Sequence, residues 1–435
     1  MGKAEFARRR KRLTEMMGEG SIAIVSAAPV RARNRDVEFP YRPDSDFYYL
    51  TGFPEPEAVA VVVPGRDQGE YLLFCRERDA ENEMWIGSRA GLEGACEDYA
   101  ADDAFPIGDI DDIVPGLLED RERVFYAMGY YPEFDQRVMG WVNRIRARSR
   151  AGINPPAEFV NLDHVLHDMR LYKSKAEVRA MRKAVEITER AHRRAMSVCK
   201  PGLREYQIEA ELRHEFMQGG SREPACPPIV AAGPNACVLH YTENSDVLRD
   251  GDLLLIDAGA EYGYYAADVS RTFPVNGRFS DAQRAIYELV LEAQSAAIAQ
   301  VKPGNHWNDP HEAAVRTLTR GLVSLGLLKG QLARLLKKEA YKPFFMHRTG
   351  HWIGMDVHDV GEYKVGNEWR VLEPGMVMTV EPGLYISKGT KGVHKRWWNI
   401  GVRIEDDVLV TKNGCEVLSE ATPKTVDAIE ALMAG

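Results

Sequence analysis

Two segments of the sequence repeat the same order of helix signals. Ser174 and Glu177 form the S-x-x-E pattern of a capping box, and Ser280 and Gln283 form the related S-x-x-Q pattern. Each pattern opens a long stretch with helical spacing, which ends at CKPG in the first copy and at VKPG in the second. A long capped helix therefore begins each copy.

A second helical segment follows in each copy, ending near 217–220 and near 324–330, and strand-like runs close each copy. Two copies of helix, helix and strands predict a pseudo-symmetric α+β catalytic domain with a site between its halves. The alternative is that common caps and turns coincide by chance.

The N-terminal part of the chain carries a different, α/β pattern. It has strand-like runs at 58–65, 70–77 and 122–129. A helical stretch follows at 137–150, and a linker rich in Pro and Gly at 151–160. The boundary is placed between this linker and Lys173. We predict a smaller domain over 1–170 and a catalytic domain over 171–435.

Composition narrows the possible partners. The net charge of -9 provides no basic footprint for nucleic acid. No apolar run approaches the ~18 residues that a membrane span needs. The basic start has no apolar stretch after it and does not resemble a secretory signal, so we expect Arg8 to Arg12 to form the solvated face of a first helix. Six scattered cysteines favour reduced thiols in the cytoplasm.

The run LLLIDAGAEYGYYAADVSRTF (253–273) places Asp257 and Asp268 in strand-like surroundings. A hairpin turning at Tyr262 and Gly263 would put these two carboxylates directly opposite each other. Their repulsion would need shared protons, an arginine or cations. The simpler interpretation is that both aspartates cap strand ends.

Three further groups, His351, Glu381 and Glu405, also lie in or beside apolar elements. Together with the two aspartates they offer four carboxylates and one imidazole, a donor set that suits Mn²⁺, Co²⁺, Fe²⁺ or Zn²⁺. Charge balance favours two divalent ions with a bridging hydroxide, which would be a strong nucleophile at neutral pH.

Several motifs resemble one family. HYTEN (240–244), the run at 253–273, HRTGHWIGMDVHDVG, LEPGMVMTVEPGLYI and GVRIEDDVLVT are similar to the pita-bread metallopeptidases and, within them, to the bacterial aminopeptidase P group of Xaa-Pro aminopeptidases. The resemblance covers nearly the whole chain. It implies a pseudo-symmetric pita-bread catalytic domain, preceded by a smaller α/β creatinase-like domain that restricts the substrate and supports oligomerisation.

The resemblance also implies the ligand set. Asp257 and Glu405 would contact the first metal ion, and Asp268 and Glu405 would bridge to the second. His351 and Glu381 would complete the second ion, and Glu381 would also move protons. Mn²⁺ is the expected metal, with Co²⁺, Zn²⁺ and Fe²⁺ as alternatives.

Other residues receive roles from the same resemblance. His358 would stabilise the oxyanion, His240 would orient the scissile region, and His347 would line the proline pocket. Arg403 and Tyr385 would hold Asp257 in place. Each of these side chains could instead serve ordinary packing or local polar pairing.

Four further positions concern the surroundings of the site. Trp85 and Asp36 match positions near a neighbouring subunit's active site in relatives, although they could be an interface tryptophan and a loop aspartate. Cys226 stands where relatives often carry an aromatic residue, so the resemblance does not define the side chains of the pocket wall. Arg348 is bulkier and more charged than expected, and it could narrow the pocket or bind an acidic group.

The implied activity is hydrolysis of the N-terminal Xaa-Pro bond of peptides by a homo-oligomer, either a dimer or a tetramer. One alternative is a prolidase, which shares the metal site but cuts only dipeptides. Another is a metal-free module that binds peptides or proteins, which the presence of all five ligands disfavours. The sequence leaves open the native metal, the physiological substrates and the oligomer size.

Overall fold

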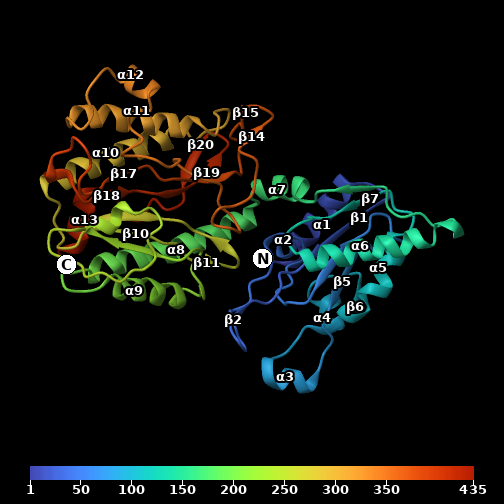
Figure 1. Cartoon of the computed structure of the whole chain (residues 1–435). Helices are drawn as coiled ribbons and strands as arrows, with labels where there is room; N and C mark the ends of the chain where they lie inside the picture. The colour runs from blue at the N-terminus through green and yellow to red at the C-terminus, as the bar shows by residue number, and fades with distance from the viewer. The chain divides into compact units, whose positions relative to one another are not determined.

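A computed structural model describes all 435 residues of the chain, which forms two compact units, Met1–Met169 and Arg170–Gly435 (Figure 1). No helix is long and apolar enough to span a bilayer.

Unit 1 is built on a six-stranded sheet in the order β6-β5-β4-β1-β7-β8. These strands are β1 (Ser21–Ser26), β4 (Val59–Val62), β5 (Tyr71–Cys75), β6 (Asp103–Pro106), β7 (Arg123–Phe125) and β8 (Glu158–Val160). A short hairpin adds β2 (Ala32–Asn34) and β3 (Val37–Glu38). The helices are α1 (Lys3–Met17), α2 (Ser45–Thr51), α3 (Ala80–Ile86), α4 (Gly91–Glu97), α5 (Ile110–Leu118), α6 (Pro132–Ala147) and α7 (Asp163–Leu171).

The central strands β1, β4 and β5 are buried along almost their whole length, as their apolar runs require. Their side chains form a core with α5 and α6. The predicted linker is wrong at its C-terminal end, because β8 pairs in parallel with β7 and completes the sheet.

The prediction that Arg8 to Arg12 form a solvated face is wrong for Arg9 and Arg10. These two side chains are 1% and 7% exposed. Each guanidinium donates to a backbone carbonyl of α2, that of Tyr49 or of Leu50, at 2.9 Å. Both cations are buried because these carbonyls and the aromatic rings of Tyr49 and Tyr71, each 4.0 Å from a guanidinium carbon, replace their hydration.

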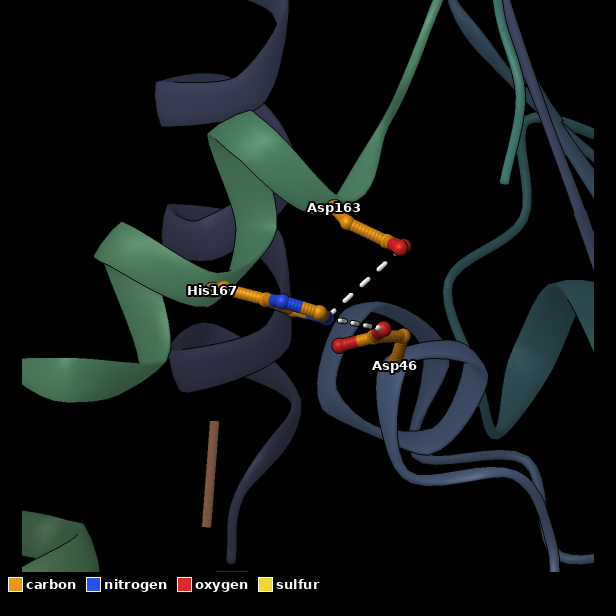
Figure 2. A group of neighbouring side chains, drawn as sticks. All are labelled: Asp46, Asp163 and His167. Atoms are coloured by element: carbon orange, nitrogen blue, oxygen red, sulfur yellow. Dashed lines mark hydrogen bonds and ion pairs between the residues drawn. The ribbon is translucent and has the colours of Figure 1, made fainter. Parts of the chain in front are cut away.

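An ion-pair group joins α7 to α2 within unit 1 (Figure 2). His167 Nε2 lies 3.3 Å from Asp46 Oδ2 and 3.7 Å from Asp163 Oδ1. Tyr130 donates its hydroxyl to the other oxygen of Asp163. These contacts hold the end of the unit against the N-terminal helices.

Unit 2 contains the two predicted copies. The first has α8 (Lys175–Val198) and α9 (Glu205–Gln218), followed by β9 (Ile229–Ala232), β10 (Leu253–Asp257), β11 (Glu261–Tyr262), β12 (Tyr265–Ala266) and β13 (Ser270–Pro274). The second has α10 (Asp281–Ile298), α11 (Asp309–Ser324) and α12 (Leu332–Lys337), followed by β14 (Lys364–Val365), β15 (Glu368–Trp369), β16 (Val377–Val380), β17 (Gly383–Ile386), β18 (Ile400–Arg403), β19 (Asp406–Thr411), β20 (Gly414–Val417) and α13 (Val426–Met433).

Both predicted capping boxes are present. Ser174 and Ser280 each accept a backbone N–H three residues on, and the partner side chains of Glu177 and Gln283 accept the N-cap N–H in return. Each copy then contributes one three-stranded antiparallel sheet, in the orders β13-β10-β9 and β16-β19-β20. A single large core unites residues of α8 to α11 with strands of both copies.

The predicted hairpin register is wrong. The two-residue turn is made by Gly263 and Tyr264, whose φ angles of 58° and 65° suit a type I′ turn, so Tyr262 pairs with Tyr265. In this register Asp257 lies opposite Ser270, and Asp268 is its diagonal neighbour on the same face.

Candidate active site

A cavity of about 550 Å³ in unit 2 gathers nearly all of the predicted site residues. Its lining consists of Leu239, His240, Asp257, Asp268, Trp307, His347, Arg348, Gly350, His351, His358, Tyr363, Trp369, Glu381, Arg403 and Glu405. All five predicted metal ligands are in this set, together with the three predicted catalytic histidines and Arg403.

Strand ends place the carboxylates. Asp257 is the last residue of β10, Glu381 directly follows β16, and Glu405 lies between β18 and β19. His351 and Glu381 are brought together by backbone pairing, since Thr379 N–H donates to His351 C=O at 2.9 Å and Glu381 N–H donates to Thr349 C=O at 2.8 Å.

The ligand atoms converge. One oxygen each of Asp268 and Glu405 and a ring nitrogen of His351 all lie within 4.8 Å of one another. His351 Nε2 is 3.4 Å from Asp268 Oδ2 and 3.9 Å from Glu381 Oε1. One carboxylate oxygen of Asp257 and one of Asp268 are buried without a hydrogen-bond partner. Such oxygens are suited to bind cations.

Crowding perturbs the acids. Burial, and then the negative charge of Asp257, raise the pKa of Asp268 well above its usual value. Burial and then Asp268 do the same to the pKa of Glu405, and burial raises the pKa of Glu381 to about 7. These carboxylates are hard oxygen donors, and they resist being ionised at the same time. Such a set fits a site for divalent cations, whose positive charge would lower the raised pKa values again.

Asp257 is the exception among the acids. Burial opposes its ionisation, but the Arg403 guanidinium outweighs this effect and lowers the pKa of Asp257. Arg403 Nη2 lies 2.5 Å from Asp257 Oδ2, and its Nη1 donates to the Tyr385 hydroxyl at 3.1 Å. Its Nε donates to Ser270 Oγ, which itself donates to Glu405 at 2.7 Å. One guanidinium thus positions two of the ligands.

Burial disfavours the charged form of two histidines, His347 and His358. Burial, followed by the charge of Arg403, lowers the pKa of His347 to about 3. Its Nδ1 is 2.7 Å from the Arg348 carbonyl and its Nε2 is 2.9 Å from the Tyr385 hydroxyl. Burial and then His351 lower the pKa of His358, whose ring lies edge-on to His351 at 4.3 Å. His240 is exposed at the cavity wall.

Two predicted residues lie in unit 1, outside this cavity. Trp85 is on α3 and is 83% exposed, and Asp36 is exposed between β2 and β3. Their proposed roles therefore stay predictions. Cys226 is partly buried, and burial followed by the charges of Asp268 and Asp257 raises the pKa of its thiol, which places it near the acidic cluster.

Sequence reasoning missed several contributors. Ser270 links Arg403 to Glu405, and the fully buried Asp407 accepts the Asp268 backbone N–H at 3.1 Å. Trp307 and Trp369 line the cavity wall. The position of Asp407 inside an alternating strand-like run was a usable signal for its burial, whereas Trp307 lies in a turn and Trp369 in the short strand β15, and neither belongs to a motif.

Comparisons with known proteins agree with this geometry. A model for metallopeptidase family M24 matches residues 179–412, and a model for the aminopeptidase P N-terminal domain matches residues 6–126. The Xaa-Pro aminopeptidase of Escherichia coli is 45% identical over 434 residues, covering 100% of this chain and 98% of that protein. The predicted fold class, a pita-bread domain preceded by a smaller N-terminal domain, is confirmed.

Solved structures extend the likeness over the whole chain. The Pseudomonas aeruginosa aminopeptidase PepP matches with a TM-score of 0.99 and 64% identity, covering 100% of this chain and 98% of that one. The zinc-substituted E. coli aminopeptidase P in complex with product matches with a TM-score of 0.97 and 45% identity, covering 100% and 98%.

Proposed function

The chain belongs to metallopeptidase family M24, and from this premise we propose that it is an Xaa-Pro aminopeptidase, which releases the first residue of peptides whose second residue is proline. The observation that carries the proposal is identity of 45% with an Xaa-Pro aminopeptidase over the full length, with all five predicted ligand residues lining one cavity. The prolidase alternative is not favoured, since these relatives are aminopeptidases.

We propose that two divalent ions, Mn²⁺ by preference, are held by Asp257, Asp268, His351, Glu381 and Glu405. When bound, the ions would lower the pKa of a water between them and polarise the scissile carbonyl. The unpartnered oxygens of Asp257 and Asp268 support this assignment.

The chain's own groups complete the reaction. Glu381 would accept a proton from the attacking water and pass it to the leaving nitrogen. His358, beside His351, would donate to the developing oxyanion, and His240 would orient the scissile bond. His347 is neutral and packs edge-on against Phe345 at 4.8 Å, which gives the proline ring an apolar neighbour.

Proline specificity follows from the substrate. An Xaa-Pro bond is a tertiary amide without an N–H, so the site needs no acceptor there, and the ring needs an apolar slot. A free amino group is attracted to the acidic cluster, which favours an exopeptidase over an endopeptidase.

The deciding experiment uses an Xaa-Pro-Yaa tripeptide and an Xaa-Pro dipeptide. Release of free Xaa from the tripeptide supports the aminopeptidase, whereas cleavage of the dipeptide alone supports a prolidase. Glu381→Ala should abolish turnover while the circular dichroism spectrum is retained. A near-normal rate in that variant would refute its assigned role.

Three further statements belong to the proposal. All six cysteines are free thiols, which supports a reducing compartment such as the cytoplasm. We expect a homo-oligomer, a dimer or a tetramer, in which residues 1–170 restrict the substrate and contribute contacts between subunits. Sedimentation analysis of the full chain, alone and after Trp85→Ala, tests the oligomer.

A further inference from the structure

Arg348 is a cation at the mouth of the active-site cavity without a carboxylate partner. Its Nη2 donates to the amide oxygen of Asn308 at 2.5 Å, and its guanidinium carbon lies 5.1 Å from the centroid of the Trp369 ring. The nearest influential acid is Glu312, which instead accepts from Asn308 Nδ2 at 2.7 Å. Neutral groups therefore hold this guanidinium in place, and no carboxylate is in contact with it.

A second cavity, of about 560 Å³, shares two lining residues with the first, His347 and Arg348. In this second cavity Lys342 is paired with Glu339 at 2.6 Å, so that its charge is compensated. Lys364 lies 4.5 Å from the same Trp369 ring and also lacks an ion-pair partner. Arg348 is thus an exposed cation in the lining of a cavity whose metal-ligand cluster is acidic.

The direction of a bound peptide follows from the negative charge of the metal-ligand cluster and the positive charge of Arg348. The substrate's amino group is attracted to the buried acids, and the proline ring lies beside His347. Arg348 lines the same cavity as His347 and is exposed, so the chain that follows proline would pass Arg348 on its way to solvent. A guanidinium is well matched to a carboxylate because it can donate two parallel hydrogen bonds.

We propose that Arg348 selects substrates that carry a carboxylate on the C-terminal side of the proline. This inference rests on the proposed function and adds its substrate class. The carboxylate has two sources, the side chain of Asp or Glu at the third position and the terminal carboxylate of a tripeptide.

The test compares four peptides with one Xaa: Xaa-Pro-Glu-NH₂, Xaa-Pro-Gln-NH₂, Xaa-Pro-Gly-OH and Xaa-Pro-Gly-NH₂. Arg348 should raise kcat/KM for at least one acidic member over its neutral partner by about fivefold, a modest factor because the guanidinium is partly exposed. The first pair reports a side-chain carboxylate and the second a terminal one. The preference should weaken at high salt.

Two variants test whether the preference depends on the charge at position 348. Arg348→Gln should remove the preference, so that kcat/KM for each acidic peptide falls to that of its neutral partner, since the charge-dependent contact is lost. Arg348→Glu should reverse it, so that Xaa-Pro-Lys-NH₂ becomes better than Xaa-Pro-Glu-NH₂. A purely structural role would not change sign with the charge.

The matched control is Arg320→Gln, on the surface of α11, where Arg320 pairs with Glu292 at 2.6 Å. It makes the same change in net charge and should keep the preference. Equal rates for acidic and neutral peptides in the parent enzyme, or a preference that survives in Arg348→Glu, would overturn the inference. Failure to cleave any of the peptides would instead refute the proposed function, so the two failures are distinct.

Discussion

Arg403 Nη2 lies 2.5 Å from Asp257 Oδ2, and the two side chains are only 5% and 16% exposed. The arginine is therefore the fixed counter-charge of one ligand in a cluster whose other acids are pushed toward their neutral forms. Through Ser270 the same guanidinium reaches Glu405. This shared support links the two acids predicted to bind the first metal ion.

We predict that Arg403→Lys lowers metal affinity and activity together. A lysine can replace the charge but cannot donate to Asp257, Tyr385 and Ser270 at once. Loss of such supporting contacts typically reduces metal affinity or activity about 10- to 100-fold. The measurement is metal content after dialysis, with kcat/KM for an Xaa-Pro tripeptide.

The control for this variant is Arg278→Lys, at a surface position whose arginine is 72% exposed and paired with Glu430. It should retain metal and activity. Normal metal binding by Arg403→Lys would show that the Asp257 geometry does not depend on the guanidinium.

A second prediction concerns metal removal. Without cations, Asp268 and Glu405 are costly to ionise in their buried positions, so ions that bind only the folded state should stabilise it by mass action. At 100 times the dissociation constant this amounts to about 2.7 kcal/mol per ion. Calorimetry of chelated protein, with Mn²⁺ added back, should show a rising Tm that follows recovery of activity.

One outcome of the chelation experiment would contradict the metal site. Full activity after thorough chelation and confirmed loss of metal would contradict the assignment of the cluster. As a control, the Asp257→Asn variant should show a smaller rise in Tm with Mn²⁺, because one carboxylate has been replaced by a neutral amide of similar size.

Local signals predicted much of the fold of unit 2. The capping boxes at Ser174 and Ser280 located α8 and α10. The pattern consists of the side chains that accept the first N–H groups of a helix, which have no partner within the helix itself. The apolar run before Asp257 located β10. These features depend on neighbours within a few residues, and a single sequence contains that information.

The missing parts depend on long-range contacts. The register around Asp257 was wrong because Tyr264 adopts a positive φ that its residue type does not suggest. Arg9 and Arg10 were assigned to solvent because their buried partners lie on another helix. Ser270 could not be given a role, since its bonds to Arg403 and Glu405 exist only after three strands meet.

A third prediction concerns stability and pH. His192 on α8 is fully buried and donates from Nε2 to the Ala258 carbonyl at 3.2 Å. Burial, and then the charge of Arg271, lower its pKa to about 4, against ~6.5 in the unfolded chain. The unfolded state therefore binds more protons in this window, and the free energy of unfolding should fall as pH drops from about 6.5 toward 4.

The size of this effect is at most about 3 kcal/mol. Urea unfolding of the parent and of His192→Gln at several pH values measures it as a difference, so that contributions from the acidic cluster cancel. The variant should show a flatter dependence below about pH 6.5. Identical slopes would mean that His192 does not become harder to protonate on folding.

The last prediction uses the close approach of two backbones beside the metal ligands. A Cβ added at Gly259 would lie 1.6 Å from the Ala267 carbonyl oxygen and 3.1 Å from the Asp268 nitrogen. Gly259→Ala must therefore push the segment that carries Asp268 away from Asp257, with a loss of about 1–3 kcal/mol in stability and a lower metal content. Gly108→Ala, where a Cβ meets nothing within 4 Å, is the control. Gly259 has no side chain that could bind a metal ion. A lower metal content in Gly259→Ala, with little change in Gly108→Ala, would therefore show that the backbone sets the ligand spacing. Normal metal content in both variants would contradict this prediction.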